Sequence, residues 1–207
     1  MIVAVLPLDD SWGARSRRIN KALRHCVNML ADVLALPAAA DPLIAFCASW
    51  GLAVPVLLVL VAIVRDVHRR EAIVEAALGG LATVVLVKLS GLIYAHQRPF
   101  AVHHVLPLVA HAADNGFPSD HSAAAGLAVA YLWPRSRLSA YIALAFGLLV
   151  GAARVAAQLH WPIDIVAGGA FGLAGGACAY LILQRRQRSA GSREPQPIGR
   201  MAERASS

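Results

Sequence analysis

Charged side chains are scarce in this chain of 207 residues, of which Asp, Glu, Lys and Arg together make up only 15%. A soluble domain carries about 25% charged and about 45–50% apolar residues, whereas hydrophobic residues make up 58% here. A water-soluble globule would therefore lack polar residues to cover its surface. The high apolar content also excludes a disordered chain, and only three cysteines exclude a disulfide-stapled miniprotein. The class that remains is an integral membrane protein.

Long apolar runs with few charges predict five membrane-spanning helices, because about 20 apolar residues cross a bilayer. The predicted spans cover residues 43–64, 72–95, 119–133, 138–157 and 165–183. At about 1.5 Å per residue, the third span covers about 22 Å of a core roughly 30 Å thick. Residues 18–36 alternate basic and apolar positions at helical spacing, which indicates an amphipathic interfacial helix. The predicted fold is an all-α membrane helix bundle with five transmembrane helices and an N-terminal interfacial helix.

The expected organisation is an N-terminal segment (1–41), a membrane domain (42–184) and a basic, disordered tail (185–207). The turns 65–71 and 134–138 and this tail lie on one side of the predicted topology and hold 11 of the 19 Lys and Arg residues. The positive-inside rule makes that side cytoplasmic. No aromatic residues interleave with these arginines as they would in a nucleic-acid groove, so we expect no nucleic-acid partner.

Most of the ionisable residues gather on the opposite, outer side, where six of the eight histidines fall. Such residues are costly in a membrane and mark functional sites. The residues concerned are His96, Arg98, His103, His104, His111, Asp114, Ser119, Asp120, His121, Arg154, His160 and Asp164. We therefore expect a site on the outer, periplasmic face of the cytoplasmic (inner) membrane.

The first cluster is His96-Gln97-Arg98-Pro99-Phe100, at the end of the second span. Proline disfavours helix at the preceding residue, so we expect Pro99 to stop the helix near residue 98. For Arg98 alone, a side chain snorkelling at the membrane edge is the better interpretation. The alternative is a bidentate clamp on a phosphate.

The second cluster, Phe117-Pro118-Ser119-Asp120-His121, precedes the third span. Ser119 is the expected N-cap, with Asp120 favourable in the first turn. The free N–H groups of such a helix start form an anion site. Capping alone would explain Ser119 and Asp120, but His121 has little structural reason to lie in the first turn of a membrane helix.

The third cluster consists of Arg154, His160 and Asp164. Pro162 suits the first turn of the fifth span, which places His160 just before that helix and Asp164 in its first turn. Asp164 could reach back as in a capping box. It could also hold the proton on one imidazole nitrogen and leave the other nitrogen free to attack. In isolation, this spacing is common and favours plain capping.

The three clusters together resemble, in order and separation, the three motifs of the type-2 phosphatidic acid phosphatase superfamily, over roughly residues 43–184. The stretch 98–121 is similar to the bacitracin-resistance type of undecaprenyl-diphosphatase, which shares Asp120 where most of the superfamily has Gly. Two positions depart from the pattern. Gly91 stands in place of a Lys, with Lys88 one helical turn away, and Ala153 stands where Ser often opens the third motif.

The resemblance implies an integral-membrane phosphatase that hydrolyses undecaprenyl diphosphate to undecaprenyl phosphate and inorganic phosphate. In it His160 attacks the terminal phosphorus to give a phospho-histidine, Asp164 fixes the His160 tautomer, and His121 protonates the leaving phosphate and activates water. The implied phosphate-binding residues are Arg98, Ser119, Asp120 and Arg154. Two arginines and a helix N-terminus can supply the electrostatic stabilisation of a metal, so we expect no metal and no cofactor.

Three alternatives stay open. A phosphatase acting on phosphatidate or phosphatidylglycerophosphate would share the same catalytic residues. A zinc site is disfavoured because HExxH, HxH and paired-Cys motifs are absent. A non-catalytic, proton-coupled carrier could use the same residues as a relay, but five spans without internal duplication argue against a repeat-built transporter. The expected partners are a polyisoprenoid diphosphate lipid and membrane lipids.

Overall fold

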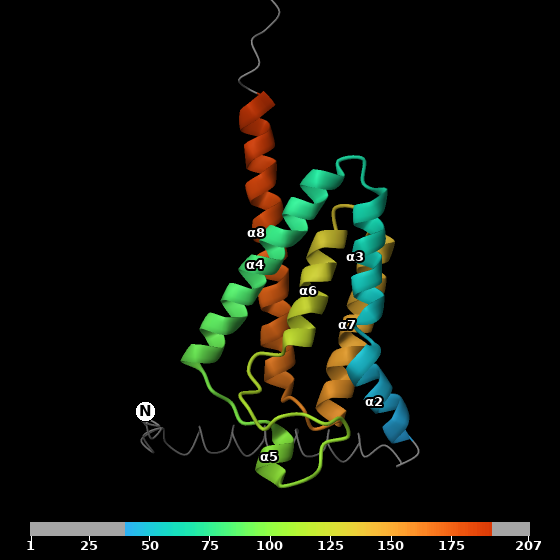
Figure 1. Ribbon diagram of the computed structural model, residues 1–207, viewed down its shortest axis with the longest axis vertical. Coiled ribbons are helices and arrows are strands. Elements are labelled where there is room, and N and C mark those ends of the chain that lie inside the picture. The colour runs from blue at the N-terminus through green and yellow to red at the C-terminus, as the bar shows by residue number, and fades with distance from the viewer. Residues whose placement is uncertain (1–39, 192–207) are drawn as a thin grey trace, which may run out of the picture. The chain divides into compact units, whose positions relative to one another are not determined.

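The computed structural model describes residues 40–191 (Figure 1). Every regular element within these residues is a helix, and the only β-type pairing among them is an isolated bridge between Gln97 and Asn115. The prediction of an all-α fold is therefore confirmed for this part of the chain. The predicted interfacial helix at 18–36 and residues 192–207 of the predicted tail lie outside the described residues.

The described helices are α2 (Asp41–Trp50), α3 (Ala53–Arg65), α4 (Arg69–Ile93), α5 (Pro99–His103), α6 (Asp120–Leu132), α7 (Arg137–Ala156) and α8 (Pro162–Gly191). By length and composition, four described stretches can cross a membrane: Asp41–Arg65, Arg69–Ile93, Arg137–Ala156 and Pro162–Ser189. The chain is therefore a multi-pass membrane protein. At about 1.5 Å per residue, α6 is only about 20 Å long, and its role as a fifth crossing remains a prediction.

The first predicted span, 43–64, is divided into two helices at Gly51 and Leu52. Pro55 explains the interruption, because proline has no N–H to donate to the carbonyl of residue 51 and its ring collides with that carbonyl. Gly51 also lies close to α7, since a Cβ added there would be 2.6 Å from Cγ2 of Val150.

The fifth predicted span, 165–183, is too short: α8 begins at Pro162 and continues to Gly191, so the predicted tail begins as helix.

Small residues let α6 and α8 approach until their backbones are in contact. A Cβ added at Gly168 would overlap the carbonyl oxygen of Ser119, and one added at Gly172 would overlap that of Ala123. This agrees with the close packing expected of a glycine-rich membrane helix. The α6–α8 seam, defined by these contacts, fixes the start of α6 relative to the start of α8.

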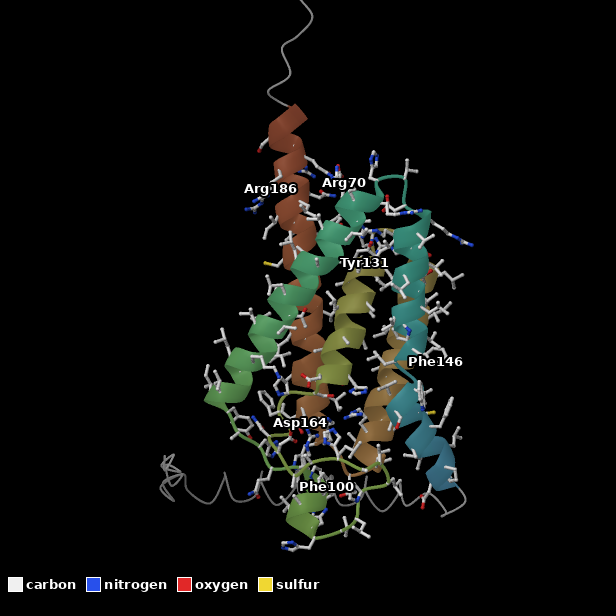
Figure 2. All side chains as sticks on the ribbon, viewed as in Figure 1. Arg70, Phe100, Tyr131, Phe146, Asp164 and Arg186 are labelled. Atoms are coloured by element: carbon white, nitrogen blue, oxygen red, sulfur yellow. The ribbon has the colours of Figure 1, made fainter. Side chains whose placement is uncertain are left out.

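The basic residues and the predicted site residues lie at opposite ends of the helices. Figure 2 shows Arg70 and Arg186 at one end and Asp164 and Phe100 at the other. At the basic end, Arg135 donates from its two terminal nitrogens to the carboxylate oxygens of Glu75, both at 2.9 Å. This bidentate contact satisfies the buried Glu75. The separation predicted from the charge pattern is therefore present in the fold.

Candidate functional site

Three loop segments meet beyond the ends of α4, α6 and α8 and bring the three sequence clusters together. The N–H of Gly116 donates to the carbonyl of His96 at 2.8 Å, and Nε1 of Trp161 donates to the carbonyl of Gln97 at 2.9 Å. The N–H of Phe100, in α5, donates to the carbonyl of Gln158 at 3.0 Å. These hydrogen bonds join the α4–α5 segment, the loop before α6 and the α7–α8 turn into one unit.

His160 lies at the centre of this unit and is only 3% exposed. Its Nδ1 atom lies 2.9 Å from the carbonyl oxygen of Gly116. Its Nε2 atom lies 3.3 Å from Nη1 of Arg98 and 3.3 Å from Nη2 of Arg154. A carbonyl only accepts hydrogen bonds and a guanidinium only donates them. The proton therefore belongs on Nδ1, and the lone pair of Nε2 points between two guanidinium groups.

Arg98 is 6% exposed, so the interpretation of this side chain as snorkelling at the membrane edge is wrong. Its Nε donates to Oδ1 of Asp114 at 2.8 Å, and its Nη1 also donates to the carbonyl of Leu159 at 3.1 Å. The predicted helix end was also wrong, because α4 stops at Ile93 and Pro99 occupies the first turn of α5. The extended segment between these helices turns Arg98 inward.

Arg154 reaches His160 from the last turn of α7 and is 4% exposed. Its Nη1 donates to the carbonyl of Ala48 at 3.1 Å, whereas its Nε has no partner among the described residues. A buried N–H without a partner is unfavourable, and two guanidinium groups that converge on one nitrogen repel each other. An anion between Arg98 and Arg154 would relieve that repulsion.

Asp164 is completely buried in the first turn of α8. Its Oδ2 accepts from the backbone N–H of Trp161 at 2.8 Å, which confirms the predicted capping contact. The same oxygen is 3.7 Å from Nδ1 of His160, a separation longer than a hydrogen bond. The nearest partner of that nitrogen is the Gly116 carbonyl, which the sequence did not indicate.

Ser119 caps α6 as predicted, since its Oγ accepts from the N–H of Ser122 at 3.4 Å. Its own N–H donates to the carbonyl of Asp164 at 3.0 Å, which links the starts of α6 and α8. Within residues 40–191, the backbone N–H groups of Asp120 and His121 donate to no other group. The helix start therefore offers free donors at the predicted anion site.

His121 lies in the first turn of α6, is partly buried, and is within electrostatic range of Arg154 and His160. Its imidazole forms no hydrogen bond with the rest of the described chain, so both ring nitrogens are available to a ligand. The carboxylate of Asp120 is exposed. The structure thus brings Arg98, Ser119, His121, Arg154, His160 and Asp164 to one place and leaves the Asp120 side chain at its edge.

Two further polar residues contact the site, His96 and Asp114, which the sequence placed on the outer side without a role. Nδ1 of His96 lies 3.1 Å from Oδ1 of Asp164, and the His96 ring stacks on Trp161 at 5.7 Å. The hydrogen bond from Arg98 holds the pKa of Asp114 below its ordinary value. Burial and the nearby charge of Arg98 lower the pKa of His111. The sequence offered one signal for each residue's place at the site: His96 lies in the first cluster, and Asp114 lies on the outer side.

Position 91 explains the departure from the superfamily's first motif. A Cβ added at Gly91 would lie 3.1 Å from the carbonyl oxygen of Phe117, and Nδ2 of Asn115 donates to the Gly91 carbonyl at 3.0 Å. The loop before α6 therefore occupies the space that a side chain would need. Lys88 is exposed on α4 and forms no hydrogen bond or ion pair with any described residue.

The histidines at this end of the molecule are held in separate contacts. His96 lies against Asp164, whereas Nδ1 of His103 lies 2.9 Å from Oε1 of Gln158. Across the described part of the chain, no group of three or more His, Cys, Asp or Glu side chains is arranged to hold a metal ion. What the site offers instead is a set of convergent cationic and N–H donors around one imidazole.

The sequence is similar to those of known proteins. The chain is 32% identical over 128 residues to undecaprenyl-diphosphatase BcrC of Bacillus subtilis, covering 61% of this chain and 66% of that relative. It is 41% identical over 80 residues to a lipid A 1-phosphatase of Rhizobium etli, covering 37% of this chain and 33% of that relative. The matched regions thus span about two thirds of the first relative and one third of the second.

Solved structures share the fold. LpxE of Aquifex aeolicus matches with a TM-score of 0.56 and 22% identity, over 73% of this chain and 93% of that structure. A PAP2-type phosphatidylglycerolphosphate phosphatase of Bacillus subtilis matches with a TM-score of 0.58 and 16% identity, over 79% and 87% of the two chains. The model of the PAP2 superfamily matches residues 72–188, more than half of the sequence. The chain therefore belongs to the PAP2 superfamily.

Proposed function

We propose that this protein is an integral-membrane lipid phosphatase that hydrolyses undecaprenyl diphosphate to undecaprenyl phosphate and inorganic phosphate. One observation carries the proposal: Nε2 of the buried His160 lies 3.3 Å from a guanidinium nitrogen of both Arg98 and Arg154. An imidazole lone pair between two anion-binding groups is the arrangement that in-line attack on a phosphoryl group requires.

In the proposed first step, the Nε2 lone pair of His160 attacks the terminal phosphorus. The N–P bond forms as the bond to the bridging oxygen breaks, and undecaprenyl phosphate leaves. The Nδ1 proton stays on its hydrogen bond to Gly116 at 2.9 Å throughout. The positive charge that the ring acquires is stabilised by that carbonyl and by the carboxylate of Asp164, 3.7 Å away.

The charge on the phosphoryl oxygens is met by the donors around His160. Arg98 and Arg154 would exchange their contacts with Nε2 for the equatorial oxygens. The capped start of α6 would add the backbone N–H groups of Asp120 and His121, with Ser119 fixing their direction. Asp120 would therefore bind phosphate through its backbone, not its carboxylate.

His121 is the proposed general acid and base. It would protonate the bridging oxygen of the leaving undecaprenyl phosphate, and the neutral imidazole would then take a proton from the water that attacks the phospho-histidine. Hydrolysis of the N–P bond releases inorganic phosphate and regenerates His160. Its partly buried position within electrostatic range of Arg154 and His160, with no hydrogen-bond partner in the described chain, supports this role.

The choice of substrate is supported by the 32% identity to an undecaprenyl-diphosphatase. A phosphatidate or phosphatidylglycerophosphate phosphatase is the alternative, because superfamily members that act on those lipids would use the same residues. The proton-coupled carrier has less support, since a proton relay does not require two buried guanidinium groups on one imidazole nitrogen.

We further propose an inner-membrane location with the site on the periplasmic face, because basic residues lie at the opposite end (Figure 2).

The test is phosphate release by the purified full-length protein. Undecaprenyl diphosphate, phosphatidylglycerophosphate and phosphatidate are supplied separately in matched detergent, and we expect the highest kcat/KM for the diphosphate. His68→Ala, which removes an exposed imidazole at the basic end of the molecule, serves as a control that should keep full activity. A preference for either glycerolipid would replace the proposed substrate. No release from any lipid by a folded protein would overturn the phosphatase assignment.

A further inference from the structure

An apolar groove lies between α6, α7 and α8, outside the set of residues used in the proposed chemistry. Its volume is about 100 Å³, and Ser122 is its only polar lining residue in the described chain. Helix α6 contributes Ser122, Gly126 and Val129, and α8 contributes Ile165, Gly169 and Leu173. Spacings of three and four residues place each set on one face of its helix. The groove therefore runs parallel to both helices.

Both lining faces begin in the first turn of their helix, at the end that carries the site. From Ser122 to Val129 and from Ile165 to Leu173 the groove extends inward by roughly 10–12 Å, at about 1.5 Å per residue. Its outer end joins the site directly, because the hydroxyl of Ser122 donates to Oγ of the N-cap Ser119 at 3.3 Å. A phosphate bound at the start of α6 would have the groove beside it.

The rim of the groove opens to the surrounding hydrocarbon. Leu148 of α7 is 64% exposed and Leu173 of α8 is 45% exposed. The volume limits what can enter, since an apolar cavity of roughly 150 Å³ accommodates one benzene molecule. The groove has room for a few carbon atoms of one chain, but not for two chains side by side.

Gly169 shows that the space is not required for helix packing. A Cβ added there would meet only the carbonyl oxygen of Ser122, at 4.0 Å, whereas the neighbouring Gly168 and Gly172 press on the backbone of α6. Glycine within a helix is less favourable than alanine. The Gly169 carbonyl packs against Gly126 of α6, but a side chain at 169 would not collide with that helix. The missing side chain therefore keeps the groove open.

We infer that this groove holds the segment of a single hydrocarbon chain next to the phosphate, and so favours a one-chain isoprenoid diphosphate over a two-chain glycerolipid. This inference rests on the proposed function, because the chain is that of the lipid whose phosphate lies at His160. A two-chain lipid would have to leave one chain outside the groove.

The test compares Gly169→Leu with Gly80→Leu. Both place a leucine in open space on a membrane helix, since a Cβ at Gly80 meets nothing within 4 Å, but only residue 169 lines the groove. Each full-length variant is assayed with undecaprenyl diphosphate and with the five-carbon isopentenyl diphosphate. We expect Gly169→Leu to lower kcat/KM at least tenfold for the long lipid, mainly through KM, and less than twofold for the short one. Gly80→Leu should change neither.

The outcomes separate the groove from the proposed function. If the unaltered protein hydrolyses neither diphosphate, the proposed function fails. If it hydrolyses both and Gly169→Leu matches Gly80→Leu, the groove inference is overturned and the phosphatase stands. An equal loss on both substrates would mean damage to the site and would also overturn it. A change in the oligomeric state of Gly169→Leu, measured by light scattering, would assign the groove to a second copy and would overturn the inference. A loss of activity seen only in lipid bilayers would assign the groove to a resident lipid and would overturn it as well.

Discussion

His160 holds its Nδ1 atom 2.9 Å from the carbonyl oxygen of Gly116. This contact decides which ring nitrogen can act as nucleophile, because a carbonyl can only accept the proton that Nδ1 carries. A backbone acceptor cannot titrate, so the tautomer does not depend on the protonation of a carboxylate. Asp164, 3.7 Å from the same nitrogen, contributes charge and not the direct hydrogen bond.

The first prediction follows from this arrangement. His160→Ala should lower kcat by a factor on the order of 1,000 or more, since no neighbouring group can replace the attacking nitrogen. His121→Ala should also lose most activity but should still form the N–P bond, so acid-labile labelled phosphate should accumulate on the protein. Thermal unfolding of both variants checks that they are folded. Full activity of His160→Ala would refute the mechanism.

The second prediction concerns Asp114 and pH. Because the hydrogen bond from Arg98 lowers the pKa of Asp114 below its ordinary value, this carboxylate stays charged from pH 5 to 9. Its contribution to the placement of Arg98 is therefore present above the ordinary pKa and is lost as pH falls through the lowered value. The Asp114 side chain is 61% exposed, so Asp114→Asn should lower kcat/KM only about two- to fivefold, as expected for an exposed ion pair. A deficit that changes between pH 5 and 9 would contradict this assignment.

The third prediction concerns metal. Activity should survive excess EDTA, because Arg98, Arg154 and the N–H groups at the start of α6 supply the positive potential around the phosphate. Phosphate release is measured before and after chelation, with a zinc-dependent phosphatase as the positive control for the chelator. Loss of activity that added zinc or magnesium restores would show that the site requires a metal.

The fourth prediction concerns sidedness. In a background without the native cysteines, a cysteine at the exposed Ala112 should react with a membrane-impermeant reagent in intact cells. The matched control is a cysteine at Val67, which is 93% exposed in the turn at the basic end. It should react only after the membrane is opened. The opposite pattern would reverse the topology.

The fifth prediction concerns Lys88. Lys88 lies one helical turn from position 91, where the superfamily's first motif has a lysine. Its exposed position and the absence of polar contacts with described residues argue that it does not replace that lysine. We expect kcat and KM of Lys88→Met to stay within about twofold of the unaltered protein. A tenfold loss with an unchanged melting temperature would place the amine at the substrate after all.

The sequence predicted the parts of this molecule that depend on composition. Long apolar runs identified the four long spans, because hydrocarbon imposes length and polarity on each helix independently. The cap at Ser119 and the contact of Asp164 with the N–H of Trp161 were also predictable, since both are local. These features require information only from residues close by in the chain.

The rest depends on contacts between distant segments. Arg98 looks like a residue at the membrane edge until Asp114 and the Leu159 carbonyl are placed beside it. The Gly116 carbonyl has no signature at all, because every residue has one. The break at Gly51 followed from Pro55, a signal that was present in the sequence but is obscured by the uninterrupted apolar run around it.

The α6–α8 seam has a consequence for how this protein tolerates mutation. Gly168 and Gly172 carry no reactive group, yet a single added methyl at either would overlap the carbonyl of Ser119 or Ala123. Any adjustment must move the start of α8, which bears Asp164 and follows His160, away from the start of α6, which bears His121. A saturation screen should therefore find inactive variants along α8 at positions that carry no catalytic group.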